Sequence, residues 1–384
     1  MYWHIEDSRY RIANPIQYLI SKLGLSMDSL SQFVLGAAVS TAFLGRKIGP
    51  RKAALVGGVL GTLPDLDVLI PFADPIDSFV YHRGWTHSVF VHALAAPILG
   101  EGLVRLFRGL RDHRWLTWMT VFLCLSTHAV IDAMTIYGTR IFWPFYPDPV
   151  GAGSVFIIDP LYTLPLLGVV IWALFRRNWT SRLQTSVVAV LLGSSAYLGA
   201  SLAVQRHVEQ MALEIFSDNG GKPERVLAIA APFNILVWKV IGLDRDSYRN
   251  LYLSLAGGNE PLEVYTHPRN PELIACLEDT PAYQKLDWFS RGFNRAELVD
   301  GRVVVSDLRM GLTPGYAFRF VVAEADGQDI RSVTPKRDLS LRRADAEDFA
   351  WLGDRLLGIP AARAAEAGFQ STTRDRAAFD CSTD

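Results

Sequence analysis

The chain has 384 residues, of which only 20% are charged, and its mean hydropathy is +0.17, so it is more apolar than an ordinary soluble domain. A net charge of -1 gives no reason to expect nucleic-acid binding. Apolar residues dominate up to about residue 205, whereas 206–384 carries mixed charge. We therefore expect a mainly α fold, in which a multi-helix transmembrane bundle over 27–205 precedes a soluble α+β domain with an antiparallel sheet over 206–358.

The first part of the chain contains only short apolar runs. Residues 1–26 are polar and aromatic without an apparent signal peptide, and we interpret them as an N-terminal extension. The runs 33–45 and 53–63 follow, and at about 1.5 Å per residue each covers about half of a bilayer. We expect them to form a tilted or re-entrant hairpin buried among longer helices, with Asp28 capping a helix over 30–44.

Three longer apolar runs are expected to cross the membrane. They cover 88–107, 115–136 and 183–204, and each is near the roughly 20 residues that about 30 Å of hydrocarbon requires. A further run over 160–175 is shorter and ends at two arginines.

The charge of the connectors predicts the orientation of the bundle. The connectors 46–52, 105–114 and 176–182 are basic and alternate with connectors that are not, which is typical of cytoplasmic loops. We therefore predict a multi-pass protein of the bacterial inner membrane whose C-terminal domain is extracytoplasmic.

Ionisable side chains gather where a bilayer would exclude them. Such groups persist at membrane depth mostly when they are paired, metal-bound or lining a wet cavity. Three neighbouring segments contribute them, namely Asp65 and Asp67, then His82, Arg83 and His87, then His128 and Asp132, and the hydroxyl of Thr86 lies in the second segment. If 88–107 and 115–136 form an antiparallel hairpin, these segments come close to one depth, and we expect one cavity entered from outside.

The residue types favour a divalent metal, with zinc as the first choice. Imidazole and carboxylate ligands suit zinc or another first-row ion, and an open coordination position would let the metal activate water. The candidate ligands are Asp65, His82, His87, His128 and Asp132. The candidate catalytic residues are Arg83, Asp67 and Thr86, and the planar fork of Arg83 could hold an anionic substrate group.

The main candidates also have ordinary structural explanations. His128 and Asp132 are spaced i and i+4, so they could simply bond each other inside a helix bundle. Arg83 could form a salt bridge, for which the acidic partners at hand are Asp65, Asp67 and Asp77.

Other polar residues nearby are less specific. Thr86 or Ser88 could cap the helix that follows, and His92 is either a further ligand or a packing residue. The remaining histidines are expected at the surface: His4, His113, His207 and His267. Cys124, Cys276 and Cys381 have no close or metal-type spacing, so neither a disulfide nor a cysteine metal site is expected.

The soluble domain shows strand patterns without a catalytic constellation. The expected strands cover 225–231, 235–241, 248–255, 295–299, 302–308 and 316–325. Asp300-Gly301 predicts a hairpin turn, and helices are expected near 271–289 and 345–357, after a helix over 205–217 that continues the last span. The tail over 359–384 is expected to be disordered.

The order of these motifs resembles one bacterial family. The motifs are Met27-Asp28-Ser29-Leu30-Ser31-Gln32, Gly61-Thr62-Leu63-Pro64-Asp65-Leu66-Asp67, His82-Arg83-Gly84-Trp85-Thr86-His87-Ser88, His128 with Asp132, and Tyr137-Gly138-Thr139-Arg140. Over about 27–210 the chain is similar to the membrane-bound, metal-dependent hydrolases, also described as LexA-binding, inner-membrane-associated hydrolases. The resemblance implies a membrane domain like zinc phospholipase C and a lipid or phosphoester substrate. Gln32 departs from the family, because many relatives would offer a histidine there, and this implies fewer metals.

Three functions remain open at this point. The first is an integral-membrane metallohydrolase acting at the extracytoplasmic face on phosphoester or lipid-linked substrates. The second is a transporter in which the same buried residues relay protons or bind a transported metal. The third is a non-catalytic scaffold with a structural metal, which a closed shell of four ligands would favour.

Overall fold

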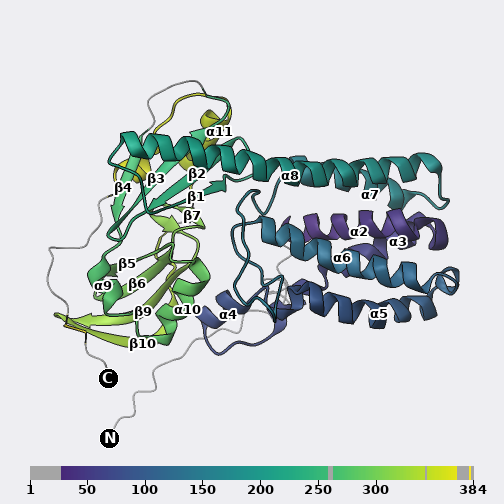
Figure 1. Ribbon diagram of the computed structural model, residues 1–384, viewed down its shortest axis with the longest axis horizontal. Coiled ribbons are helices and arrows are strands. Elements are labelled where there is room, and N and C mark those ends of the chain that lie inside the picture. The colour runs from purple at the N-terminus through teal and green to yellow at the C-terminus, as the bar shows by residue number, and fades with distance from the viewer. Residues whose placement is uncertain (1–26, 258–262, 342–343, 370–379, 382–384) are drawn as a thin grey trace, which may run out of the picture.

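The computed structural model describes residues 27–257, 263–341, 344–369 and 380–381. A bundle of helices lies at one end of the molecule and two β-sheets lie at the other, and one long helix runs along both (Figure 1). The apolar helices come first and the antiparallel sheets follow, which confirms the predicted fold class at this level. The predicted N-terminal extension, including His4, lies outside the described residues.

The bundle is built from the apolar runs of the sequence. Its helices are α2 (Met27–Ile48), α3 (Pro50–Thr62), α5 (Val89–Leu106), α6 (Arg114–Met134), α7 (Pro160–Phe175) and α8 (Ser181–Asp218). Among the described helices, α5, α6 and α8 are long and apolar enough to cross a membrane. They correspond to the three spans that the sequence predicts, and α7 is a shorter apolar helix.

The α2–α3 hairpin differs from the prediction in length. α3 has 13 residues, whereas α2 has 22 and covers about 33 Å at about 1.5 Å per residue. The first turns of α2 continue the helix because their polar groups are satisfied inside the bundle, where Ser31 bonds to Thr163 and Gln32 bonds to Asp132. The half-length prediction is therefore wrong for α2. The cap predicted for Asp28 concerns a side chain outside the described residues.

Glycines allow α2 and α3 to pack closely. A Cβ atom on Gly36 would lie 2.3 Å from the carbonyl oxygen of Gly57 and 2.8 Å from the Cα of Gly61. Any larger residue at Gly36 would force the two helices apart. This contact fixes the depth of the C-terminal end of α3, from which the first acidic segment follows.

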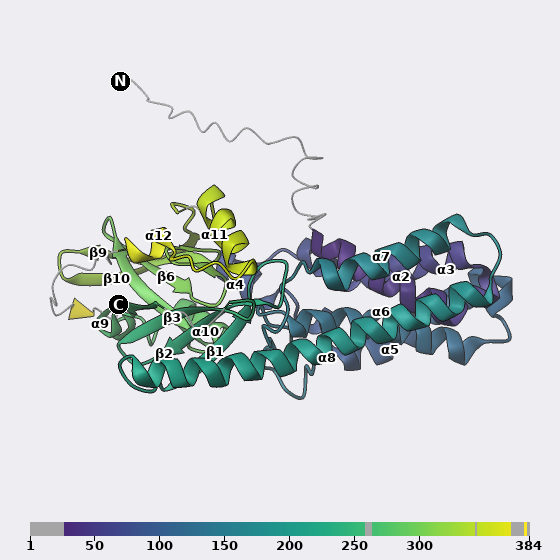
Figure 2. The ribbon, with the colours of Figure 1, turned by 90° about the horizontal axis from the view of Figure 1, so that it is seen from above.

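The three basic connectors lie together at the end of the bundle that is farthest from the sheets (Figure 2). A Cβ on Gly109 would lie 2.3 Å from the carbonyl oxygen of Lys47, and one on Gly49 would lie 3.6 Å from that of Arg177. The grouping agrees with the alternation of charge in the sequence.

Helix α8 connects the bundle to the first sheet, as predicted for residues 205–217. Its first half packs in the bundle core through Leu183 and Val187. Its second half packs against β1 (Arg225–Ala230), β2 (Val237–Leu243) and β3 (Ser247–Ser254), with Phe216 and Trp238 among the buried contacts. These strands and β4 (Val264–Pro268) form a sheet of order β1-β2-β3-β4 that is antiparallel throughout.

The second sheet has the order β11-β10-β9-β6-β5. Its members are β5 (Asn294–Val299), β6 (Arg302–Asp307), β9 (Arg319–Asp326), β10 (Asp329–Arg337) and β11 (Asp380–Cys381), and a separate pair is formed by β7 (Gly311–Leu312) and β8 (Gly315–Tyr316). The pairing of β5 and β6 across the turn at Asp300 and Gly301 confirms the predicted hairpin. Strand β10 was not predicted, because most of its side chains are exposed or half-buried and give no apolar alternation.

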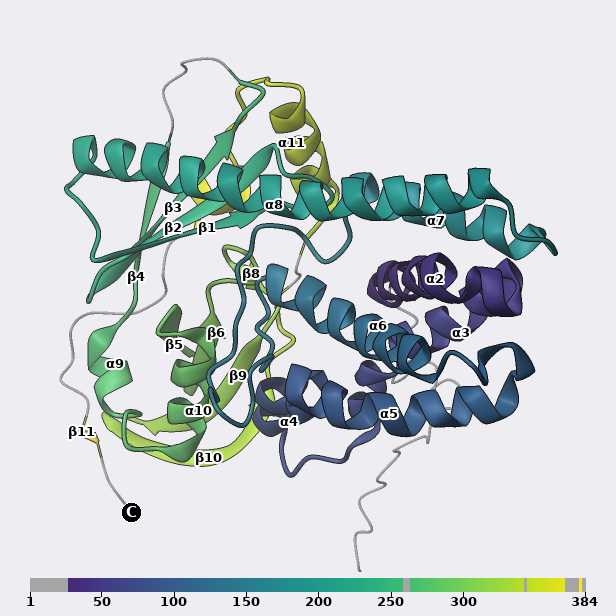
Figure 3. The same cartoon turned by 45° about the vertical axis from the view of Figure 1, so that its right-hand side comes forward.

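Segments of the membrane half reach into the core of the second sheet (Figure 3). The short helix α4 (Pro75–Tyr81) places Ile76 and Phe79 in the core with Phe289 and Phe320. The loop before α7 contacts the first sheet instead, where Gly153 accepts a hydrogen bond from the amide of Ala230 on β1. The helices α9 (Pro271–Ala275), α10 (Pro281–Ser290) and α11 (Ala346–Leu356) fall where the sequence places helices.

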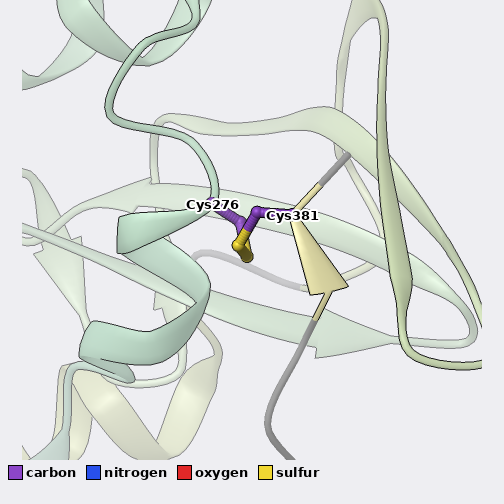
Figure 4. Close-up of a disulfide and its surroundings, with 2 residues drawn as sticks. All are labelled: Cys276 and Cys381. Carbon is purple, nitrogen blue, oxygen red and sulfur yellow. A yellow bond between two sulfur atoms is a disulfide. The ribbon is translucent and has the colours of Figure 1, made fainter. Parts of the chain in front are cut away.

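Three predictions about the C-terminal region are wrong. Cys276, just after α9, forms a disulfide with Cys381 on β11 (Figure 4). The two residues are 105 positions apart, and only the pairing of β11 beside β10 brings them together, which no spacing rule reveals. The tail predicted to be disordered contains α12 (Ala364–Ala367), where Glu366 is buried and bonded to His267, a residue expected at the surface. Residues 370–379 and 382–384 lie outside the described residues.

Candidate metal centre

Two short 3-10 helices and one face of α6 position the polar residues at the end of the bundle that faces the sheets. Pro64 begins the 3-10 helix η1 (Pro64–Leu69) directly after α3, and this turn carries Asp65 and Asp67. The 3-10 helix η2 (Trp85–His87) carries His87 and ends at Ser88, whose hydroxyl accepts hydrogen bonds from the first amides of α5. Ser88 is therefore the helix cap, which leaves Thr86 available for other bonds. His128 lies one turn before Asp132 on α6, so both face the same side.

Four of the predicted residues meet at one point. The Nε2 atoms of His87 and His128 lie 3.1 Å apart. The Oδ2 atom of Asp132 lies 3.3 Å from each of these two nitrogens. The Oδ1 atom of Asp65 lies 3.3 Å from the nitrogen of His87 and 3.4 Å from that of His128. His87, His128 and Asp132 are buried, and Asp65 is partly exposed. The predicted convergence of these four side chains is present.

The outer nitrogens of both imidazoles are already used as donors. The Nδ1 atom of His128 lies 2.6 Å from the carbonyl oxygen of Gly61, which can only accept, so this nitrogen carries the hydrogen. Thr86 donates its hydroxyl hydrogen to Asp67 at 3.0 Å, so it must accept from the Nδ1 atom of His87, also at 3.0 Å. In the neutral rings the two Nε2 lone pairs therefore face each other, an arrangement that a cation between them would relieve.

The donor set fits a tetrahedral first-row cation. Metal–ligand bonds of about 2.0–2.1 Å in a tetrahedron place the ligand atoms about 3.3 Å apart, and the separations given above are 3.1–3.4 Å. Asp132 contributes a second observation. Its Oδ1 atom accepts a hydrogen bond from Gln32, but its buried Oδ2 atom has no hydrogen-bond partner among the described residues. Two imidazoles and two carboxylates are a common zinc ligand chemistry.

Arg83 pairs with a residue that the sequence did not suggest. Its Nε atom lies 3.3 Å from Oδ2 of Asp132, and Nη1 donates to the hydroxyl of Thr135 at 3.2 Å. The predicted salt bridge to Asp65, Asp67 or Asp77 is therefore not formed by this side chain, although its backbone amide bonds to Asp67. The guanidinium is buried and charged, and it faces the same carboxylate oxygen as the two imidazoles.

His82 lies beside the four-residue group rather than within it. Its Nδ1 atom bonds to Oδ1 of Asp67 at 2.9 Å, and its side chain is 28% exposed. Burial alone would raise the pKa of Asp67, but the hydrogen bond and charge of His82 lower this pKa below its ordinary value. Asp65, Asp67 and His82 form a second group whose possible ligand atoms lie within 4.8 Å of one another. A ligand role for His82 thus stays a prediction.

His92 and Gln32 support the centre from outside. The ring of His92 bonds to the carbonyl oxygen of Thr86 at 2.8 Å and to Ser126 at 3.3 Å, so both of its nitrogens are occupied. It is a packing residue. Gln32 orients Asp132 by donating a hydrogen bond to it. In the sequence, this residue is noticeable as a polar side chain next to an apolar run. The carbonyl oxygen of Gly61 carried no such signal, because any residue supplies a backbone oxygen.

A cavity of about 770 Å³ lies beside the centre, between the bundle and the sheets. His82 and Arg83 line it on the bundle side, and Lys239, Arg309 and Trp351 line it on the other side. The sequence predicts a cavity around all of these polar residues, but this cavity adjoins the four-residue group only through His82 and Arg83, and the C-terminal half forms much of its wall.

Comparison with known proteins adds one finding. Residues 27–208 match the model of a family described as YdjM inner membrane protein. The match spans the bundle and includes every predicted metal and catalytic residue. No curated protein and no solved structure matches the chain. The family match and the three apolar helices support a location in the inner membrane.

Proposed function

We propose that this protein is an integral inner-membrane hydrolase whose metal ligands are Asp65, His87, His128 and Asp132. The observation that carries the proposal is the pair of facing Nε2 atoms, 3.1 Å apart, with two carboxylate oxygens beside them. The resemblance to membrane-bound hydrolases makes a phosphoester or lipid-linked compound the proposed substrate.

The residues around the centre would have different roles in such a reaction. A bound divalent ion, zinc in our proposal, would act as a Lewis acid and lower the pKa of water. His128 and His87 are held in the ligating tautomer by Gly61 and by Thr86 with Asp67. Arg83 lines the cavity and would bind a substrate oxyanion there, because its planar guanidinium suits the oxygens of an anionic group. His82, oriented by Asp67, would transfer a proton to the leaving group.

The proposed orientation places the centre and the sheets outside the cytoplasm. Two observations support it. The three basic connectors lie at the opposite end of the bundle, where cytoplasmic loops belong. The disulfide between Cys276 and Cys381 belongs in an oxidising compartment, which the space outside the inner membrane provides.

The test is metal analysis of the full chain purified in detergent. We expect about one zinc per wild-type chain and none in His87→Ala or His128→Ala, because a lost ligand weakens the site more than the bundle. His113→Ala is the control, since His113 precedes the first turn of α6, at the end of this helix opposite His128, and should leave the metal in place. Hydrolysis of a phosphodiester by the wild type should disappear in the same two variants. Full metal content and activity in His128→Ala would refute the proposal.

A structural metal is the second candidate, because four protein donors suffice to fill a tetrahedral shell. Asp65→Asn separates the two candidates, since Asp65 is the partly exposed member of the set. In a hydrolase this change should lower turnover while the protein stays folded. In a scaffold the wild type would bind metal without hydrolysing any substrate, and metal removal would only lower its melting temperature.

A further inference from the structure

The cavity beside the metal centre is completed by residues that lie outside the region matched by the family. Its bundle side carries His82 and Arg83, whereas Arg309, Phe318 and Arg337 come from the sheets. The family match ends at residue 208. Whatever these residues bind is therefore a property of the C-terminal half of this chain.

Three arginines in this cavity stack on one aromatic cluster. The distances from guanidinium carbon to ring centre are 5.2 Å for Arg83 on Tyr137, 5.4 Å for Arg309 on Phe289 and 5.2 Å for Arg337 on Phe318. Phe79 of α4 touches all three rings, with centroid separations between 4.2 and 5.4 Å. The three guanidinium groups are therefore held around one small region at the junction of the two halves.

One hydrogen-bond donor of Arg309 has no acceptor among the described residues. Asp307 accepts from its Nε atom at 3.0 Å and from its Nη2 atom at 2.6 Å, which fixes the guanidinium plane. Its Nη1 atom is buried and has no hydrogen-bond partner among the described residues. A buried charged donor without a partner costs free energy, so a ligand acceptor at this position would be favoured.

The charge and shape of the cavity define the ligand. Three arginines line it (Arg83, Arg309 and Arg337) against one carboxylate, Asp348, which is bonded to Arg363. Lys239 also lines it, and burial lowers the pKa of this lysine to about 7. The rest of the lining is mainly apolar, with Val68, Phe72 and Phe349 among its members. Leu66, Leu69 and Ile70 are exposed in the same segment as Val68, at the end of the membrane helices. A compound with one anionic group and a hydrocarbon chain matches both parts.

We infer that Arg309, with Arg83 and Arg337, forms an anion subsite that binds the phosphate of an amphiphile whose hydrocarbon chain lies in the cavity. A phosphate suits three guanidinium groups because it presents three acceptor oxygens. The inference rests on the proposed function only in naming this amphiphile as the substrate. Arg83 also contacts Asp132, so the same phosphate would lie next to the metal centre.

The experiment measures binding to the full chain in detergent after metal removal with a chelator, so that it does not depend on hydrolysis. The probe is dioctanoyl phosphatidic acid, and the comparison probes are dioctanoylglycerol, which lacks the phosphate, and inorganic phosphate, which lacks the chains. We expect the phosphatidic acid to bind at least about tenfold more tightly than either, since charge-assisted bonds and apolar burial each add more than a factor of ten. Equal binding of dioctanoylglycerol would overturn the anion subsite. Equal binding of inorganic phosphate would overturn the amphiphile.

Variants assign the effect to the subsite. Arg309→Gln should weaken the phosphatidic acid by at least about tenfold, whereas Arg302→Gln, an exposed arginine on β6, should not. Because Arg309→Gln leaves Asp307 without its partner, Ala317→Trp provides a second variant that narrows the cavity and keeps every arginine. It should also weaken binding. Unchanged binding in both variants would refute the inference even if the wild type holds zinc, and loss of zinc binding alone would refute only the proposed function.

Discussion

Thr86 connects the metal centre to a residue that is no part of the four-ligand group. Its hydroxyl donates to Asp67 and accepts from His87, so it sets which nitrogen of that imidazole carries the hydrogen. Residues of this kind are as important to a metal site as many ligands, because they orient the ring and raise its basicity. The sequence put Thr86 among the catalytic candidates, and its contacts indicate a positioning residue.

Thr86→Val should weaken zinc binding while leaving all four ligand side chains in place. Removal of such an orienting partner typically lowers metal affinity by about 10–100-fold. The measurement is competition for zinc against chelators of graded affinity. Thr127→Val is the control, since the Thr127 hydroxyl donates to carbonyl oxygens of its own helix, those of Leu123 and Cys124. An affinity equal to the wild type would show that His87 is oriented by other contacts.

Glu366 gives the sheets a pH-dependent stability. Burial alone would raise its pKa, but hydrogen bonds from His267, Tyr252 and Asn250 lower the pKa below its ordinary value. A carboxylate with a lowered pKa stabilises the folded state above the pKa of the unfolded chain, near 4.3, and loses this effect as pH falls through the folded pKa. Glu366 and its partners are buried, so water screens this stabilising interaction only weakly.

Glu366→Gln should therefore destabilise the protein by about 2 kcal/mol at pH 7, the usual worth of a buried bond to a charged group. The difference from the wild type should begin to shrink as the pH falls below the unfolded pKa near 4.3, and it should go on shrinking until the folded carboxylate is protonated too. Thermal unfolding in detergent at several pH values measures both effects. Glu324→Gln, at an exposed position on β9, should leave the profile unchanged. A constant gap between Glu366→Gln and the wild type at all pH values would contradict this account.

Among the helices and strands, the confirmed predictions rest on the periodicity of apolar residues and on the residue types found in turns. The three spans, the strands β1 to β3 and the hairpin at Asp300-Gly301 all follow from local patterns. The four-residue centre could be predicted for a similar reason, because charged residues inside or next to apolar runs are easy to recognise in a sequence. Elements whose structure depends on distant partners were missed. Examples are the burial of α4 against the second sheet and the disulfide partner of Cys276.

The contact between α2 and α3 should control the metal centre from a distance. Gly36→Ala places a Cβ 2.3 Å from the Gly57 carbonyl oxygen, so α3 must move, and with it the Gly61 carbonyl that fixes His128. Overpacking of this kind costs about 1–3 kcal/mol. We expect a lower melting temperature together with weaker zinc binding. Gly168→Ala in α7 is the control, because nothing lies within 4 Å of its added Cβ. A stable variant with normal zinc affinity would show that the helices adjust without moving the centre.

At the scale of the whole molecule, the proposed site lies where two differently built halves meet. The bundle supplies the proposed metal ligands, and residues of the C-terminal half line the cavity beside His82 and Arg83. Contacts across the junction are extensive, since Gln205 bonds to the carbonyl oxygens of both Ala152 and Ala228, and Lys285 pairs with Asp77. The sheets are therefore fixed relative to the metal centre, and their side of the membrane decides from which compartment the cavity can be reached.

The orientation is open to a direct test. Because the basic connectors lie at the end opposite the sheets, a reporter fused after residue 384 should be extracytoplasmic. Alkaline phosphatase, which needs an oxidising compartment, should be active in this fusion, and green fluorescent protein should be dark. The disulfide gives an independent readout, since Cys276 and Cys381 should react with maleimide only after reduction, while Cys124 stays buried in α6. An active phosphatase fused in the connector 105–114, with an inactive one after 384, would reverse the orientation and place the proposed hydrolase site on the cytoplasmic side.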